Sequence, residues 1–215
     1  MTDARLQAAD RSYQQAVFAG DPSGLAPAER ELAGVEADLA LARGRLLHAR
    51  YLQERSAEDP EELRLFEQAA RIYADLGDQR GEGEALFWVG IVHQVIRDDQ
   101  ETAVPLFERS LALAADSDDD LTRSYALRHL GIAAHAAGDL AAARSHLEAS
   151  TRLRQELGFH AGAAANLVGL AYLAAAEERT DDVRRILDEA LDLVDRPEAA
   201  GVRVWVEEAR ADLGL

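Results

Sequence analysis

The stretch Leu121–Leu157 reads LTRSYALRHLGIAAHAAGDLAAARSHLEASTRLRQEL and is the clearest structural pattern in the chain. Apolar and small residues recur in it at intervals of three and four, which is the period of an amphipathic α-helix. Gly138-Asp139 divides the stretch into two such segments, and both residues are typical of a break between helices. The stretch therefore predicts two helices that fold back on each other.

Neighbouring stretches repeat this pattern when Gly90, Gly131 and Gly169 are aligned, at spacings of 41 and 38 residues. Each glycine follows a bulky aliphatic residue and precedes, by 12 to 14 residues, a triplet with internal spacings of four and three. Glycine and the small triplet members let two helices approach closely, and the bulky middle member fills the gap between adjacent hairpins. The triplets are Ala103, Phe107 and Ser110; Ala143, Leu147 and Ser150; and Val183, Leu187 and Ala190.

The chain before these repeats predicts two further helices. Residues 3–19 form a helical pattern whose apolar anchors are Leu6, Tyr13, Val17 and Phe18. A longer pattern covers residues 27–54, with Pro27 in the first turn, where proline is tolerated. Helical spacing predicts that its buried side is marked by Leu32, Val35, Leu39, Leu46 and Leu47. This segment would be the first helix of a degenerate repeat, with Ala49 in the place of the glycine.

The whole pattern predicts an all-α fold of about ten antiparallel helices joined by short connections. We expect three parts, namely N-terminal helices in residues 1–57, repeats in 58–195 and a capping helix in 196–215. Apolar residues mark the face of the last helix that would cover the final hairpin, and an exposed part of that face could form a homodimer. They are Val202, Trp205, Val206 and Leu213.

The composition narrows the classes of function. The net charge is −17, and residues 58–120 hold 17 acidic residues and five arginines. This charge disfavours direct binding of nucleic acid and would steer a basic partner toward the middle of the chain. The chain has no cysteine, and all 23 basic residues are arginine, which excludes disulfides, thiolate ligands and a lysine Schiff base. Without a secretory signal or a long apolar run, we expect a cytoplasmic protein with no membrane span.

The repeat residues resemble the tetratricopeptide repeat. The period of about 40 residues and the linkers that begin at Leu76-Gly77 and Leu157-Gly158 are similar to the longer MalT-like subtype, which is common in bacterial signal-transduction ATPases and regulators. The resemblance covers residues 58–195, and more loosely 27–195, and implies a right-handed α-α superhelix, or solenoid. Its clearest matches are Leu130-Gly131, Gly138-Asp139, Ala143, Leu147, and Gly169 with Tyr172.

The resemblance also implies that the first helix of each hairpin lines a concave groove. Residues at fixed offsets from each glycine would point into this groove and give it an apolar floor with a few polar groups, suited to a partner's peptide or helix. An open alternative is that they pack the superhelix, or that the N-terminal helix fills the groove. The candidate partner-binding residues are Glu84, Phe87, Ile91, Gln94, Tyr125, Arg128, Ile132, His135, Asn166, Leu170 and Leu173.

The same patterns give no reason to expect catalysis, a cofactor or a bound metal. The six histidines include no pair at i and i+4 and no HExxH motif, so no metal site is predicted. The acidic turn Asp116–Asp120 lacks the glycine and glutamate of a calcium loop, and we expect Asp120 to cap the next helix instead.

The sequence therefore favours a non-catalytic interaction, scaffold or regulatory module that binds another protein. Two other classes stay open. A small-molecule-sensing regulatory domain would need a closed pocket around Phe87, Ile132 and His135. An accessory enzyme of a biosynthetic pathway would need acid and base side chains that converge in the groove.

Overall fold

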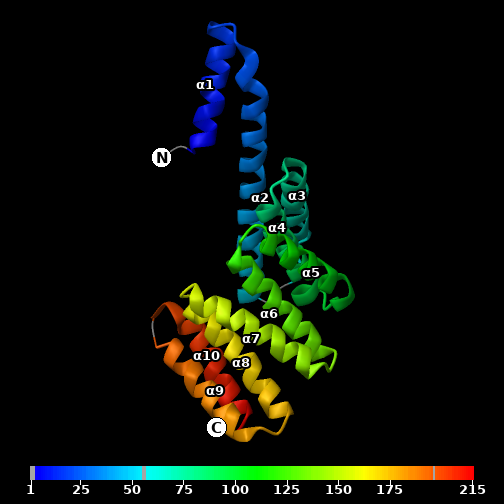
Figure 1. The fold of residues 1–215 in the computed structure, drawn as a ribbon, viewed down its shortest axis with the longest axis vertical. Coiled ribbons are helices and arrows are strands. Elements are labelled where there is room, and N and C mark those ends of the chain that lie inside the picture. Colours follow the sequence, from blue (N-terminus) through cyan, green and yellow to red (C-terminus); the bar gives the residue numbers. More distant parts are fainter. Residues whose placement is uncertain (1–2, 55–56, 196) are drawn as a thin grey trace. The chain divides into compact units, whose positions relative to one another are not determined.

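The computed structural model describes residues 3–54, 57–195 and 197–215, and within these ranges it is helical with no strand (Figure 1). This confirms the predicted all-α class. The predicted domain boundary at 195/196 falls on residue 196, which lies outside the described ranges, whereas the one at 57/58 lies within them. The α-helices are α1 (Ala4–Phe18), α2 (Leu25–Glu54), α3 (Pro60–Leu76), α4 (Gln79–Ile91), α5 (Gln100–Asp116), α6 (Asp120–Ala136), α7 (Leu140–Glu156), α8 (His160–Ala176), α9 (Thr180–Leu193) and α10 (Ala200–Asp212).

Three short helical segments, η1 (Pro22–Gly24), η2 (Val92–Ile96) and η3 (Pro197–Ala199), adjoin these helices. The chain divides into two compact units, Met1–Asp99 and Gln100–Leu215, and within each unit successive helices pack on one another. None of the described helices combines the length and the apolar character needed to cross a membrane.

Aspartates begin several helices by accepting a hydrogen bond from a free backbone N–H of the first turn. Asp59 caps α3 as predicted, and its Oδ1 accepts from the N–H of Glu61 at 2.9 Å. The prediction that Asp120 caps α6 is wrong by one residue, because Asp119 accepts from the N–H of Thr122 at 3.1 Å. Asp119 has the non-helical dihedral angles of a capping residue, while Asp120 already belongs to the helix.

The first unit is organised around α2, whose small residues face α3. Ala37, Ala40 and Gly44 are buried on that side. A Cβ atom built on Gly44 would lie 2.5 Å from Cε1 of Phe66, so only glycine allows this close approach. Gly44 therefore takes the place that the sequence comparison gave to Ala49, which is exposed.

The predicted buried side of α2 is wrong. Leu32, Leu39 and Leu46 are 37%, 49% and 70% exposed, and Val35 and Leu47 are only partly buried. Helix α2 carries small residues on one side and leucines on the other, and α3 packs on the small side because it allows a closer approach. The predicted anchors of α1 are exposed as well, and no residue of α1 is buried; they are Leu6, Tyr13, Val17 and Phe18.

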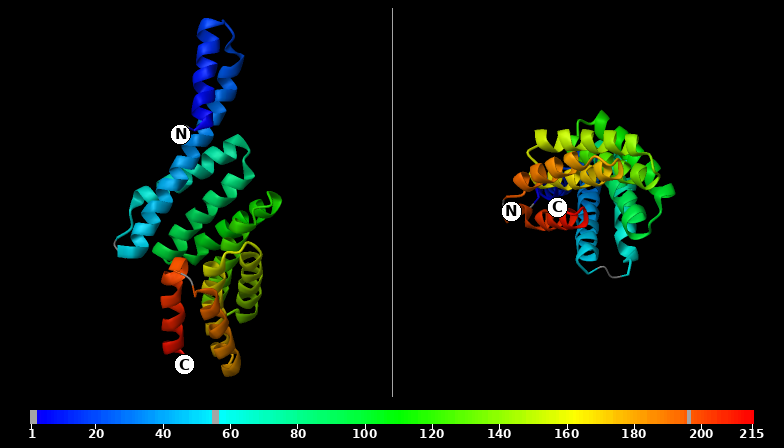
Figure 2. Two further views of the ribbon diagram at one scale, coloured as in Figure 1. Left: turned by 90° about the vertical axis from the view of Figure 1, so that its left-hand side faces the viewer. Right: turned by 90° about the horizontal axis from the view of Figure 1, so that it is seen from below.

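The second unit contains the hairpin predicted from Leu121–Leu157, which is formed by α6 and α7. A Cβ atom on Gly131 would lie 2.9 Å from Cγ of Leu147, and one on Gly169 would lie 3.1 Å from Cδ1 of the same leucine. Leu147 therefore fills the space between α6 and α8, as the repeat pattern predicted. The last helix, α10, packs on α8 and α9, and Figure 2 shows it alongside α8. Its Val206 is buried, while Trp205 is half exposed.

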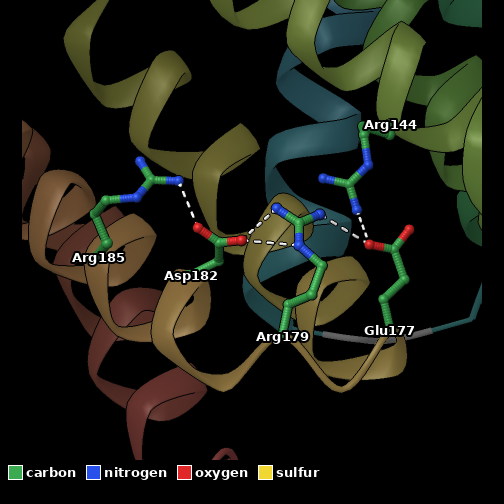
Figure 3. Close-up of polar contacts among 5 residues, drawn as sticks. All are labelled: Arg144, Glu177, Arg179, Asp182 and Arg185. Carbon is green, nitrogen blue, oxygen red and sulfur yellow. Dashed lines mark hydrogen bonds and ion pairs between the residues drawn. The ribbon is translucent and has the colours of Figure 1, made fainter.

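A chain of ion pairs joins α7 to the start of α9 (Figure 3). Glu177 accepts from Arg144 and, at 2.9 Å, from Nη1 of Arg179. Nε of Arg179 donates to Asp182 at 2.8 Å, and Arg185 donates to the other oxygen of Asp182 at 3.1 Å. Hydrogen bonds from Arg144 and then Arg179 lower the pKa of Glu177, and those from Arg179 and then Arg185 lower the pKa of Asp182.

We expect the Arg179→Gln substitution to destabilise the protein at neutral pH and to have little effect in acid. The pKa values of Glu177 and Asp182 are 4.5 and 3.8 in the unfolded state and are lower in the folded state. These carboxylates therefore stabilise the folded protein at pH values above 4.5 and 3.8, and the stabilisation is lost as the pH falls through their folded-state pKa values. The difference in melting temperature between wild type and variant should therefore shrink as the pH falls from about 7 to about 3.

Arg184→Gln provides the matched control, because Arg184 is exposed on α9 and lies outside this chain of ion pairs. A difference for Arg179→Gln that stays constant with pH would contradict the stabilising role of these ion pairs.

Candidate functional site

One side of α6 is open to solvent and carries four of the predicted partner-binding residues. Leu121 and Ile132 are 44% and 37% exposed, His135 is exposed, and Tyr125 and Arg128 are partly exposed. Their spacing of three or four residues places them on one side of the helix. We call this set the α6 face; it consists of Leu121, Tyr125, Arg128, Ile132 and His135.

Two arginine side chains, Arg128 of the α6 face and the buried Arg154 of α7, converge on Asn166. Nη1 of Arg128 donates to the carbonyl oxygen of Ala165 at 2.8 Å and to Oδ1 of Asn166 at 2.9 Å. Nη1 of Arg154, from α7, donates to the same Oδ1 at 3.1 Å and to the carbonyl oxygen of Gly162 at 2.8 Å. The amide oxygen of Asn166 therefore accepts hydrogen bonds from both guanidinium groups.

Small polar residues extend this network into the interior. Nδ2 of Asn166 donates to Oγ of Ser150 at 2.8 Å, and Oγ of Ser150 donates to the carbonyl oxygen of Ser124 at 2.5 Å. Nε of Arg154 donates to Oγ of Ser124 at 3.3 Å. Ser124, Ser150 and Asn166 have no exposed surface, so the network is rigidly held by α6, α7 and α8.

Arg154 is 2% exposed and packs against two neighbouring aromatic rings. Its guanidinium carbon is 4.9 Å from the ring centre of Tyr125 and 5.4 Å from that of Phe159, which are cation–π distances. Burial lowers the pKa of Arg154 to about 10, helped by repulsion from Arg128, and burial lowers the pKa of Arg128 to about 10. Both groups are still cationic at neutral pH.

The hydrogen-bond partners of these two cations are neutral carbonyl, amide and hydroxyl oxygens. Nη2 of Arg154 is buried and has no hydrogen-bond partner among the described residues. A buried charge is normally paired, because removing it from water costs more than neutral hydrogen bonds return. The site therefore has unbalanced positive charge, in a chain whose net charge is −17.

An apolar hollow lies next to this positive charge. It has a volume of about 340 Å³ and is lined by Leu121, Tyr125, Leu157 and Phe159. Tyr125 and Phe159 also contact the guanidinium of Arg154, so the hollow and the arginines share two side chains. The arrangement suits a ligand with an apolar group and an adjacent anion, because each part has its own contact.

The other predicted partner-binding residues are mostly inside the packing. Phe87, Ile91 and Gln94 are 2%, 3% and 6% exposed, and Glu84 is partly exposed and accepts from Arg45 at 2.8 Å. Asn166, Leu170 and Leu173 are 0%, 6% and 0% exposed. Leu170 and Leu173 belong to the same core as Val206 and Ala209 of α10. For these six buried residues the structure agrees with the alternative in which they pack the helices.

The sequence reasoning missed Arg154, Ser124, Ser150 as a polar group, and Phe159. One signal was present, because Arg154 continues the triplet Ala143, Leu147, Ser150 by another helical turn and so falls on the buried side of α7. An arginine at a core position is uncommon and points to a functional or strongly bonded group.

The first unit holds a second buried polar pair, again absent from the predictions. Nδ1 of His48 lies 2.9 Å from Oε1 of Glu62, and both residues are buried. Glu62 begins the triplet-like pattern that continues through Phe66 and Ala69, so this pair joins α2 to α3. Over the described ranges, no group of three or more potential ligands is placed to hold a metal ion.

Two comparisons with known proteins complete this description. No protein-family model matches the chain, and a search of curated proteins likewise found no match.

Proposed function

We propose that the chain is a non-catalytic interaction module whose α6 face binds a carboxylate-bearing amphipathic helix of a partner protein. The observation that carries the proposal is the pair Arg128 and Arg154, two cations whose described partners are all neutral. A carboxylate from a partner would balance this charge, and charge-assisted hydrogen bonds to arginine are among the stronger polar contacts.

The shape and polarity of the surface support a helical ligand. Leu121, Tyr125, Arg128, Ile132 and His135 lie along about four turns of α6, which is the length that a short amphipathic helix covers. Leucines of such a helix would enter the hollow beside Tyr125 and Phe159, and its acidic residue would face Arg128. This proposal also includes a right-handed tetratricopeptide-like superhelix for the repeated hairpins, supported by the glycine–leucine packing at Gly131 and Leu147.

A small-molecule sensor is the less favoured alternative. That function called for a closed pocket around Phe87, Ile132 and His135, and the side chains of Ile132 and His135 are exposed. Exposed side chains in a row suit an extended macromolecular contact better than an enclosed ligand.

The test uses two synthetic amphipathic helical peptides that differ in one residue, glutamate or glutamine, within a leucine stripe. We expect the 215-residue chain to bind the glutamate peptide about tenfold more tightly than the glutamine peptide, measured by fluorescence anisotropy. Arg128→Gln should remove this preference, and Ile132→Asp should weaken binding of both peptides because it places a charge on the apolar surface.

Arg152→Gln is the control, because Arg152 is an exposed arginine on α7 outside the α6 face. Equal binding of the two peptides, or an unchanged preference in Arg128→Gln, would overturn the proposal. Circular dichroism of each variant would establish that the helices are intact.

A further inference from the structure

Helix α2 carries a row of leucines that no other described part of the chain covers. They are spaced by seven residues, and their side chains are 41%, 37%, 49% and 70% exposed. Smaller apolar residues follow each leucine by three positions, and together the two sets form the heptad pattern of a coiled coil over four heptads. The leucines are Leu25, Leu32, Leu39 and Leu46, and the smaller residues are Ala28, Val35, Ala42 and Ala49. Of the smaller residues, Ala28 is buried and Val35 is partly buried, while Ala42 and Ala49 are exposed.

Helix α1 adds apolar side chains to the same surface. Leu6, Tyr13 and Val17 lie on one side of α1, about a quarter turn from the side that faces α2. The leucines of α2 lie about a quarter turn from the side that faces α1. In each helix the quarter turn from the contact side to the apolar side follows the direction in which the helix winds from its N-terminus to its C-terminus. Because the two helices are antiparallel, these two rotations bring the apolar sides to the same face of the hairpin. The α1–α2 hairpin therefore has one continuous apolar face.

Only the first half of α2 is flanked by α1 (Figure 1). Arg5, in the first turn of α1, pairs with Asp38 at 2.6 Å, so α1 reaches no farther along α2 than about this residue. Leu39 and Leu46 lie beyond Asp38, Leu39 at the middle of α2 and Leu46 in its second half. The half of the hairpin that contains α1 thus has an apolar surface formed by two helices. The other half is a single exposed helix, which could lie on the two-helix surface of a second copy.

Charges beside the leucines specify the direction of pairing. Glu29, Glu36, Arg43 and Arg50 are exposed and spaced by seven residues, one position after the smaller apolar residues. The first two are acidic and the last two are basic. If two copies of α2 pair antiparallel, one register places Glu29 opposite Arg50 and Glu36 opposite Arg43 at the same time. Parallel pairing would instead place like charges at the same level.

Charge separation along a helix also follows the helix dipole, which favours acids near the start and bases near the end. That effect falls off within the first and last turns, and Glu36 and Arg43 lie in the middle of α2. The dipole also gives no reason for four leucines at heptad spacing to be exposed. Complementary charges and an uncovered apolar row are both accounted for by a second copy of the same helix.

We propose that two copies of this chain associate through their α1–α2 hairpins, with α2 of one copy antiparallel to α2 of the other. The second half of each α2 lies on the two-helix surface of its partner, so the same contact is made twice about a two-fold axis. This interface uses a different surface from the α6 face and does not depend on the proposed function.

Sedimentation of the 215-residue chain over a wide concentration range tests the proposal. We expect a species of twice 23.4 kDa. Glu29→Arg with Glu36→Arg should weaken association about tenfold or more, because it opposes arginine to arginine in the partner. Adding Arg43→Glu and Arg50→Glu to the same chain should restore the dimer, because all four charges are then exchanged. A general loss of helix stability would not be repaired in this way, and circular dichroism measures that loss separately.

The absence of cysteine from the sequence allows a clean test of direction. A mixture of Glu36→Cys and Arg43→Cys chains should give mostly mixed disulfide dimers on mild oxidation, because these positions are opposite in the antiparallel register. Homodimers of each single variant would indicate parallel pairing and overturn the proposal. A wild-type chain that stays monomeric at every concentration would also overturn it, and so would a four-site variant that fails to recover the dimer.

Discussion

Replacing Gly131 with leucine is expected to lower the free energy of unfolding by about 3 kcal/mol or more, because it overpacks the α6–α7 hairpin. A Cβ atom at this position would lie 2.9 Å from Cγ of Leu147 and 3.2 Å from the carbonyl oxygen of Ala143. The first neighbour is a branched carbon in a side chain that is 3% exposed, and the second is backbone. Neither can move away without disturbing α7. Chemical denaturation followed by circular dichroism measures the change.

Gly201→Leu is the matched control for this prediction. Gly201 is exposed in α10, and a Cβ atom there would meet nothing within 4 Å. Leucine has the higher helix propensity, so the control should be neutral or stabilising by up to about 1 kcal/mol. Equal effects of the two substitutions would contradict the close packing of α6 against α7.

The second large effect is expected at Asn166. Asn166→Ala removes the oxygen that accepts from Arg128 at 2.9 Å and from Arg154 at 3.1 Å, and the amide that donates to Ser150. The partly exposed Arg128 and the buried Arg154 would lose a shared acceptor, and we expect a loss of about 3–5 kcal/mol in the free energy of unfolding.

Asn166→Asp separates the charge of this site from its shape. The aspartate carboxylate has nearly the same size and would supply the missing negative charge, so we expect a smaller loss of stability than for Asn166→Ala. The same variant should lose the preference for the glutamate peptide, because the arginines are already paired. If Asn166→Asp kept that preference, unbalanced charge would not be the basis of recognition.

The sequence was sufficient to predict the helices and the packing of the central hairpin. Helical period and the glycine–leucine spacing report contacts between helices that are neighbours in the chain, and Gly131 and Leu147 make such contacts. The number of helices and the cap at Asp59 were also predictable, because the residues that start and stop a helix lie within a few positions of its ends.

Predictions failed where the structure depends on a choice between surfaces or on distant helices. Helix α2 has both a small-residue side and a leucine side, and periodicity alone does not tell which of them α3 covers. Leu170 and Leu173 are buried in a core that includes α10, which follows them by more than 25 residues. Arg154 was overlooked because a charged residue is rarely found in a core, and its burial depends on acceptors from α6 and α8 together.

The absence of any buried residue in α1 has a consequence for the energetics of assembly. A helix whose side chains shelter little apolar surface opens at a low cost in free energy, and its backbone hydrogen bonds are then within reach of water. A partner that binds the α1–α2 hairpin only when α1 is packed on α2 would stabilise that packed state by its own binding free energy. The order of α1 would then depend on protein concentration, so that folding of the first unit and association of two chains are thermodynamically linked.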